Sequence, residues 1–373
     1  MGVSTLFAAY ARYRDGARGT DDRRKAQAQC WRTRLGACVF ACITAASAAA
    51  DTLRIATFAA PLSRDGPGLL LRDIQKAEDP QILAALRVIE TVSPDILVLT
   101  DMDYDYGHAA LNALPLDYPY RFALRPNSGL ATGLDLDANG RIGEPRDAMG
   151  YGRFAGDGGL AILSRLPIDP ATVTDLSHIR WADLPDADLP PMADEVRAVQ
   201  RLSSTAHWIV PIQGGPTILA YAATPPVFDG PEDRNGKRAR DETRLWSLVL
   251  DGHFGEPPDS FVIAGLANID PFDGEGDGGF MRDFLNDPRW IDPLPRSEGG
   301  NIPDPSQIGD PALDTADWDE AGAGNLRVSY VLPSSDLTVS ESGVFWPNAE
   351  WLGDSGPHRL VWVDIEIGQG PGD

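Results

Sequence analysis

One polar stretch of the chain has oxygen-bearing side chains at alternate positions, a spacing that suits a hard cation. Side-chain oxygens that could ligate the cation occupy positions one, three and five of a loop, and a glycine forms the turn at position six. The residue at position seven and a later aspartate complete the candidate set of ligands. These residues are Asp135, Asp137, Asn139, Gly140, Arg141 and Asp147. The arrangement is typical of Ca²⁺ loops of the EF-hand type.

The match to that loop is incomplete. Position twelve, where a bidentate Glu would close the coordination shell, is Arg146, and no helix is predicted on either side. Glu144 or Asp147 would have to supply the missing oxygen. Two interpretations follow: a structural Ca²⁺ ion that fastens a long loop, which we favour, or a surface cluster of Asx turns in an acidic protein.

A second acidic group follows a predicted strand. Asp101, Asp103 and Asp105 alternate along the chain. If the strand continues through them, all three face one side and offer another place for a metal ion. A solvated acidic loop is the other interpretation.

Short apolar runs, most of them bounded by Gly, Pro, Asp or Asn, predict the strands that position these residues. The runs cover 53–58, 95–99, 159–163, 217–222, 261–264, 326–332 and 359–365. One helix is predicted to begin with Asp79 as N-cap and Pro80 at its first position, and to end at Ser93 before Pro94. A second helix is predicted over 241–250.

These elements indicate one α+β domain over residues 51–373, since neither an internal repeat nor a low-complexity linker divides that stretch. Stretches 125–156 and 274–324 are long and polar. We therefore expect both to be surface insertions.

The first fifty residues have the order of a secretory signal peptide. A basic stretch, 23–34, precedes an apolar run of small residues, 35–50, with small-x-small sites at 46–48 and 48–50. We predict that residues 1–50 are a signal peptide with a long n-region and that the protein is periplasmic or extracellular. The apolar run is shorter than the roughly 20 residues of a membrane span, so no stable membrane anchor is expected after cleavage.

Charge and cysteine content exclude several functions for the rest of the chain. The protein has 32 Lys and Arg against 55 Asp and Glu, a net charge of −23, and its three cysteines all lie within the first fifty residues. Disulfide scaffolds, thiolate zinc sites and cysteine nucleophiles are therefore excluded from the body. An acidic surface repels phosphate backbones, so nucleic acid is not an expected partner.

The strand-end sequences, taken in order, resemble the endonuclease/exonuclease/phosphatase family, which shares the fold of pancreatic deoxyribonuclease. The resemblance covers essentially 51–365 and is carried by seven ordered blocks. These blocks are 53–58, 95–101, 158–167, 224–230, 262–271, 327–333 and 358–362. It implies a four-layer α/β/β/α sandwich of two mostly antiparallel sheets, and hydrolysis of a phosphodiester or phosphomonoester assisted by Mg²⁺ or Mn²⁺.

Measured against the family pattern, most catalytic positions are substituted. The resemblance implies that Asp101 replaces the metal-holding Glu, and that Asn268 and His358 are retained. Groups for phosphate contact, proton transfer and metal support are lost at Ala59, Ala222, Leu266, Ser329 and Pro357. Ala, Leu and Pro neither bind a hard cation nor move a proton.

Two functions remain open. The first is a catalytically impaired or inactive member, a pseudoenzyme. It would bind a phosphoester small molecule or a protein partner through the cleft that holds the substrate in active family members. The second is an active extracytoplasmic phosphohydrolase with a rearranged metal site, using Asp101, Asn268 and His358 with Mg²⁺ or Mn²⁺. We favour the first, because the missing groups are those that the chemistry requires.

Overall fold

The computed structural model describes residues 51–300, 306–319, 322–347 and 349–367. The signal peptide predicted over residues 1–50 lies outside these ranges. Within the described ranges, no helix combines the length and the apolar character needed to cross a bilayer.

Six strands form the first sheet, in the order β12-β13-β1-β2-β4-β3. They are β1 (Asp51–Leu62), β2 (Ile96–Met102), β3 (Tyr120–Phe122), β4 (Gly159–Ser164), β12 (Val339–Phe345) and β13 (Leu360–Ile367). β1 and β2 run parallel, and the other neighbours are antiparallel. All residues of β4 are buried, which explains why this strand appears in the sequence as a continuous apolar run.

Five strands form the second sheet, in the order β11-β8-β7-β6-β5. They are β5 (Thr174–Asp175), β6 (Ala206–Val210), β7 (Thr217–Ala222), β8 (Phe261–Leu266) and β11 (Ser329–Pro333). Here β7 and β8 form the parallel pair. A separate ribbon pairs β9 (Ala316–Asp317) with β10 (Asn325–Leu326) in antiparallel fashion.

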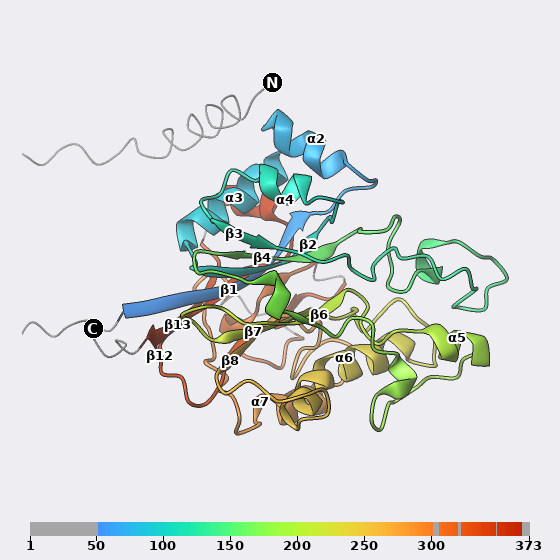
Figure 1. Cartoon of the computed structure of the whole chain (residues 1–373). Helices are drawn as coiled ribbons and strands as arrows, with labels where there is room; N and C mark the ends of the chain where they lie inside the picture. Colours follow the sequence, from blue (N-terminus) through green and yellow to red (C-terminus); the bar gives the residue numbers. More distant parts are fainter. Residues whose placement is uncertain (1–50, 301–305, 320–321, 348, 368–373) are drawn as a thin grey trace, which may run out of the picture.

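The two sheets pack against each other and helices cover their outer faces, with α2, α3 and α4 over the first sheet and α6 and α7 over the second (Figure 1). Residues from both sheets, such as Ile55 and Val262, share one buried cluster. The predicted sandwich of two mostly antiparallel sheets is confirmed. The helices are α2 (Leu69–Lys76), α3 (Pro80–Val92), α4 (Ala109–Ala113), α5 (Asp194–Val199), α6 (Arg234–Leu250) and α7 (Gly278–Leu285). Short 3₁₀ turns are η1 (Pro145–Asp147), η2 (Pro170–Thr172), η3 (Trp181–Asp183), η4 (Pro311–Leu313) and η5 (Glu350–Ser355).

The predicted start of α3 is confirmed, and that of α6 is wrong. The Asp79 carboxylate accepts a hydrogen bond from the Ile82 amide at 3.0 Å, as an N-cap does. α6 begins seven residues before the predicted 241, at Arg234. Its first half is rich in charge, yet Arg238 is buried and donates to the Leu202 carbonyl oxygen at 2.8 Å. Hydrophobic periodicity does not detect a helix whose buried face carries arginine.

The prediction that 274–324 is a surface insertion is also wrong in part. Besides α7, this stretch contains the buried residues Asp314, Thr315 and Ala316. The Thr315 hydroxyl oxygen accepts hydrogen bonds from the amides of Val328 at 2.8 Å and Ser329 at 3.0 Å. Threonine thereby satisfies backbone groups at the start of β11, and the insertion becomes part of the sandwich edge.

Candidate functional site

The carboxyl-terminal ends of β1, β7 and β8 meet at one edge of the sandwich and form a small apolar cluster there. Its buried members are Ala59, Ala222, Leu266, Ala316 and Val328, and Trp318 and Leu326 pack against them. Ala59, Ala222 and Leu266 are the positions at which the sequence predicts lost catalytic groups. The fold thus brings these positions together, and what they build is a hydrocarbon contact rather than a polar site.

The β9-β10 ribbon lies over this cluster and is held by the segment before β13. The Asp317 amide donates to the Pro357 carbonyl oxygen at 2.9 Å. Ala316 forms an antiparallel bridge with His358. The Arg359 guanidinium pairs with the Asp317 carboxylate at 2.9 Å. Pro357 stands where the resemblance implies a carboxylate. Its contact with the ribbon is made by its backbone carbonyl oxygen.

His358 lies against the ribbon without a partner that would orient it. Its ring packs edge-on against the Trp318 ring, with centroids 5.1 Å apart. Its Nδ1 atom is buried and has no hydrogen-bond partner among the described residues. Burial, followed by the Arg359 charge, lowers the pKa of His358 to about 4. The imidazole is therefore neutral at pH 7 and lacks the carboxylate that would support its protonated form.

Ser329 and Asn268 flank the cluster and take structural roles. Ser329 pairs with Leu266 across β11 and β8, and its buried hydroxyl has no partner in the described part of the chain. The Asn268 side chain donates to the Ala223 carbonyl oxygen at 2.8 Å. Its backbone is left-handed, with φ 58°, a conformation that asparagine tolerates better than most residues. This amide thus joins the loops after β7 and β8.

Asp101 is the sole predicted site residue at this edge that retains a carboxylate. It follows Thr100, which is paired with Ala59 in the first sheet, and its backbone is left-handed, with φ 61°. The residue is exposed to solvent. Desolvation of its carboxylate by the surrounding protein, followed by the carboxylates of Asp103 and Asp157, raises the pKa of Asp101 to about 7.

Of the two interpretations of Asp101, Asp103 and Asp105, the structure does not form the shared strand face. β2 ends at Met102, and its pairing with β4 is irregular beside Thr100. Asp103 is buried and accepts hydrogen bonds from the backbone amides of Arg64 at 2.9 Å and Gly158 at 3.1 Å. Asp105 accepts the first amides of α4, from Ala109 at 2.6 Å and Ala110 at 2.7 Å. The two carboxylates therefore accept hydrogen bonds from the backbone amides of different segments.

The residues at this edge offer a Mg²⁺ or Mn²⁺ ion one free carboxylate, the smallest number with which such an ion is normally held. Such an ion is normally held by one or two carboxylates together with substrate phosphates. The nearby Asp157 carboxylate is occupied by the Ser63 hydroxyl at 2.9 Å and the Arg153 amide at 2.8 Å. With alanine and leucine at the other family positions, Asp101 remains a single ligand.

Three carboxylates of the candidate Ca²⁺ loop lie close together. Asp135, Asp137 and Asp147 each offer an oxygen, and these oxygens lie within 4.8 Å of one another. Of the residues that the structure describes, no other group of three or more His, Cys, Asp and Glu side chains meets this condition. The sequence motif and the geometry therefore agree on the position of a candidate Ca²⁺ loop.

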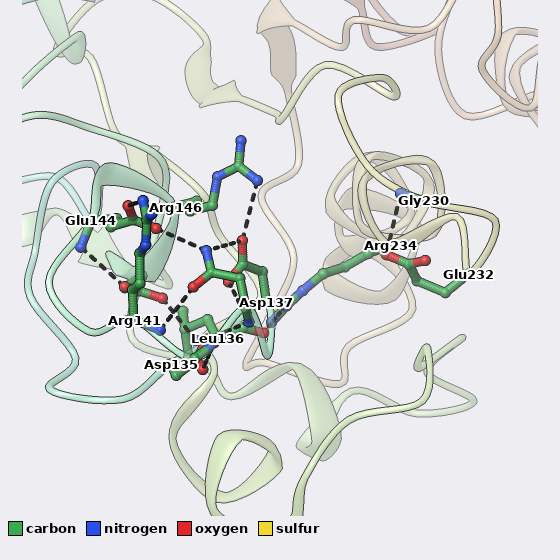
Figure 2. A network of polar contacts seen from close by, with 12 residues as sticks. Asp135, Leu136, Asp137, Arg141, Glu144, Arg146, Gly230, Glu232 and Arg234 are labelled. Carbon is green, nitrogen blue, oxygen red and sulfur yellow. Dashed lines mark hydrogen bonds and ion pairs between the residues drawn. The ribbon is translucent and has the colours of Figure 1, made fainter.

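Arginine and backbone amides share the oxygens of this loop (Figure 2). The Arg146 guanidinium pairs with the Asp137 carboxylate at 3.2 Å. The Gly140 amide donates to Asp135 at 2.7 Å. Asp147 is buried and accepts from the Leu136 amide at 2.9 Å and the Glu144 amide at 3.0 Å. Arg146 at position twelve thus stands beside the carboxylates, where a Ca²⁺ loop normally has Glu.

Two further loop residues contact Glu144. The Asn139 side chain donates to Glu144 at 2.8 Å and to Asp137 at 3.1 Å, and the Arg141 guanidinium pairs with Glu144 at 3.1 Å. Arg234 reaches across from α6 and donates to the Leu136 carbonyl oxygen (Figure 2). This hydrogen bond connects the insertion 125–156 to α6. No sequence motif predicts the contact.

Trp318 and Leu326 pack against the apolar cluster, a role that the sequence did not predict. Trp318 lies in a polar stretch without strand or helix periodicity, and Leu326 begins the predicted strand run 326–332. Their role depends on which strand ends meet in space, and local sequence patterns do not contain that information.

The family model described as Endonuclease/Exonuclease/phosphatase family matches residues 74–350, more than half of the chain. Similar solved structures include an endonuclease/exonuclease/phosphatase from Beutenbergia cavernae DSM 12333, at 15% identity and TM-score 0.48, covering 86% of this chain and 73% of that one. A family protein from Bacteroides vulgatus has 13% identity and TM-score 0.48, with 85% and 100% covered. Sphingomyelinase C from Streptomyces griseocarneus has 14% identity and TM-score 0.46, with 84% and 99% covered. No protein of curated function matches the sequence.

Proposed function

The chain belongs to the endonuclease/exonuclease/phosphatase family, and from that premise we propose that it is a catalytically impaired or inactive member that acts as a binding protein. The observation that carries the proposal is the apolar cluster of Ala59, Ala222 and Leu266. Loss of a general base alone costs about 10²–10⁴ in rate. Here the residues that would supply base, metal support and phosphate contact are replaced by side chains that pack together.

The alternative is a phosphohydrolase with a rearranged metal site. The open carboxylate of Asp101 supports it, since this group accepts a proton near neutral pH. Against it stand His358, whose pKa of about 4 leaves it neutral, and Asn268, whose amide is engaged with Ala223. The binding protein is therefore the better supported function.

Hydrolysis assays decide between the two. Bis-p-nitrophenyl phosphate and p-nitrophenyl phosphate would be supplied with Mg²⁺ or Mn²⁺, and we expect no turnover above buffer. The control is an Asp101→Ala, His358→Ala double variant, purified identically to expose contaminating activity. Metal-dependent turnover that the double variant lacks would overturn the proposal.

We also propose that the protein is exported, with a phosphoester small molecule or another protein as its ligand. The leader-like sequence of residues 1–50 supports export. The test is expression of the full chain followed by fractionation and amino-terminal sequencing. Processing to a chain that begins at Ala49 or Asp51 is expected, and an unprocessed cytosolic product would contradict it.

For the loop around Asp137 we propose a structural Ca²⁺ ion. The converging carboxylates of Asp135, Asp137 and Asp147 support it, and a hard cation there would offset their repulsion. Ca²⁺ should raise the melting temperature in a concentration-dependent way, and a chelator should reverse the rise. The matched control is Asp147→Asn, which should abolish the response. An unchanged melting temperature for the wild type would contradict the ion.

A further inference from the structure

The exposed aromatic residues of this protein are gathered at one edge. Within the described ranges, the aromatic side chains that stand out from the surface are Tyr106, 98% exposed, Phe228, 86%, Tyr151, 68%, and Phe272, 51%. Tyr106 follows β2, Phe228 follows β7 and Phe272 follows β8, while Tyr151 precedes β4. All four therefore lie on loops at the edge where the apolar cluster sits.

Contacts join these loops in two pairs, one pair on each sheet. The Tyr104 amide donates to the Gly156 carbonyl oxygen at 2.8 Å, which joins the loops of Tyr106 and Tyr151. On the second sheet, Asn268 joins the loops of Phe228 and Phe272 through its bond to Ala223. A β-carbon at Gly276 would lie 3.3 Å from Cγ of Pro226, so these two loops also touch further out.

Scattered single exposed aromatics are ordinary on protein surfaces, but a concentration at one edge is typical of an interaction site. Phe228 has a left-handed backbone, with φ 71°, which is unusual for a bulky residue. The loop thus presents this side chain to solvent in spite of local strain. One aromatic already contacts a cation: the Arg282 guanidinium lies 5.4 Å from the Phe272 ring centroid.

The charge of three of these loops selects the partner. The loops of Tyr106, Phe228 and Phe272, which are 101–108, 223–233 and 267–277, contain several Asp and Glu and no Lys or Arg, whereas the loop of Tyr151 contains Arg141, Arg146 and Arg153. Aromatic faces attract guanidinium and ammonium groups, and carboxylates beside them add attraction for the same cations. An anionic partner, such as nucleic acid or an acidic membrane surface, is repelled by this combination.

We propose that these loops, which we term the aromatic rim, bind a basic polypeptide through its Arg and Lys side chains. The proposal rests on the proposed function, because it treats this edge as a binding surface rather than a catalytic one. It goes further by naming the chemistry of the partner. The rim supplies ring faces on both sides of the cluster, and the surrounding carboxylates steer cationic side chains toward them.

The test uses a fluorescently labelled oligo-arginine peptide and measures its binding by anisotropy at physiological salt. A triple variant, Tyr106→Ser, Phe228→Ser, Phe272→Ser, should weaken binding about tenfold or more, since each ring contact contributes modestly. The control is Leu294→Ser. Leu294 is 51% exposed, as Phe272 is, and it follows Ile291, whose amide donates to the carbonyl oxygen of Pro333 at the end of β11. This variant should bind as the wild type does.

A second pair of variants separates rim binding from general attraction to an acidic protein. Glu275→Gln, in the rim, should weaken binding more than Glu256→Gln, which lies in the loop after α6. Equal effects of the two, or unchanged binding by the triple variant, would overturn the proposal. So would binding of acidic phospholipid vesicles in place of the peptide.

Failure of this proposal is distinguishable from failure of the proposed function. Anisotropy reports binding without any phosphoester present, so turnover in the hydrolysis assay counts against the inactive enzyme and leaves the rim result standing. Circular dichroism and melting temperatures of every variant establish that a loss of binding is not a loss of fold.

Discussion

Leu266 packs with Ala59 and Ala222, at a position where the family resemblance implies an acid. A carboxylate placed there alone would be buried among hydrocarbon groups with no partner. Leu266→Asp should therefore lower the free energy of unfolding at pH 7 by about 2–4 kcal/mol, as measured by urea denaturation. Leu294→Asp, at an exposed position, is the control. Equal small losses would show that the cluster is not a packed unit.

The raised pKa of Asp101 predicts how the stability of the protein changes with pH. Its pKa of about 7 lies above the ordinary value of about 3.9, so the folded protein binds more protons than the unfolded chain between those values. Stability contributed by protonated Asp101 is therefore present at low pH and lost as pH rises toward 7. Asp101→Asn should match the wild type near pH 4 and become the more stable protein at pH 8.

Denaturation midpoints of both proteins across this pH range test the sign. Asp65→Asn, whose carboxylate is exposed, is a control that should not reproduce the trend. A variant advantage that is constant with pH would refute the argument. At this scale the resemblance implies which residue types are replaced. It does not show that Asp103 accepts from the distant amides of Arg64 and Gly158, while Asp105 binds the nearby amides at the start of α4.

The β9-β10 ribbon should depend on its contact with His358. Trp318→Ala removes the ring that packs edge-on against the imidazole and admits water to a group whose pKa is about 4. The pKa of His358 should then rise toward its ordinary value of about 6.5, as followed by NMR titration. Stability should fall by roughly 2 kcal/mol for a half-buried ring.

Trp351→Ala is the matched control, because Trp351 is also half-buried but packs against Phe345 and Arg87. It should leave the His358 titration unchanged. An unaltered His358 pKa in Trp318→Ala would mean that the ribbon does not shield the ring.

The candidate Ca²⁺ loop offers a gain-of-binding test. Arg146 stands at position twelve and pairs with Asp137, so Arg146→Glu replaces a competing cation by a ligand. This variant should show a larger Ca²⁺-induced rise in melting temperature than the wild type at equal ion concentration. Arg141→Glu, at a position whose side chain faces Glu144, should not. Calorimetric titration that finds equal affinities would contradict the assignment of position twelve.

Element positions followed from sequence where local chemistry defines them. Asp79 and Pro80 specify the start of α3, and apolar runs specify the central strands. The start of α6 was missed because buried Arg238 is satisfied by carbonyl oxygens of distant loops. The ribbon was missed because two-residue strands have no periodicity. Contacts between remote segments, rather than propensity, decide those elements.

The net charge of −23 is a property of the whole molecule that opposes compaction. Added salt screens this self-repulsion, since the Debye length falls from about 30 Å at 0.01 M to about 8 Å at 0.15 M. The melting temperature should therefore rise with NaCl over this range. Tetramethylammonium chloride should give a similar rise, because the effect is screening and not ion binding. A melting temperature that falls with both salts would refute it.

The left-handed backbone at Asp101 and Asn268 stores strain at the ends of β2 and β8. Such conformations cost free energy and persist where the surrounding structure enforces them. Natural chains sit close to a stability threshold, so part of the stability of the packed sheets offsets the cost of these two bends, which set the direction of the loops that follow.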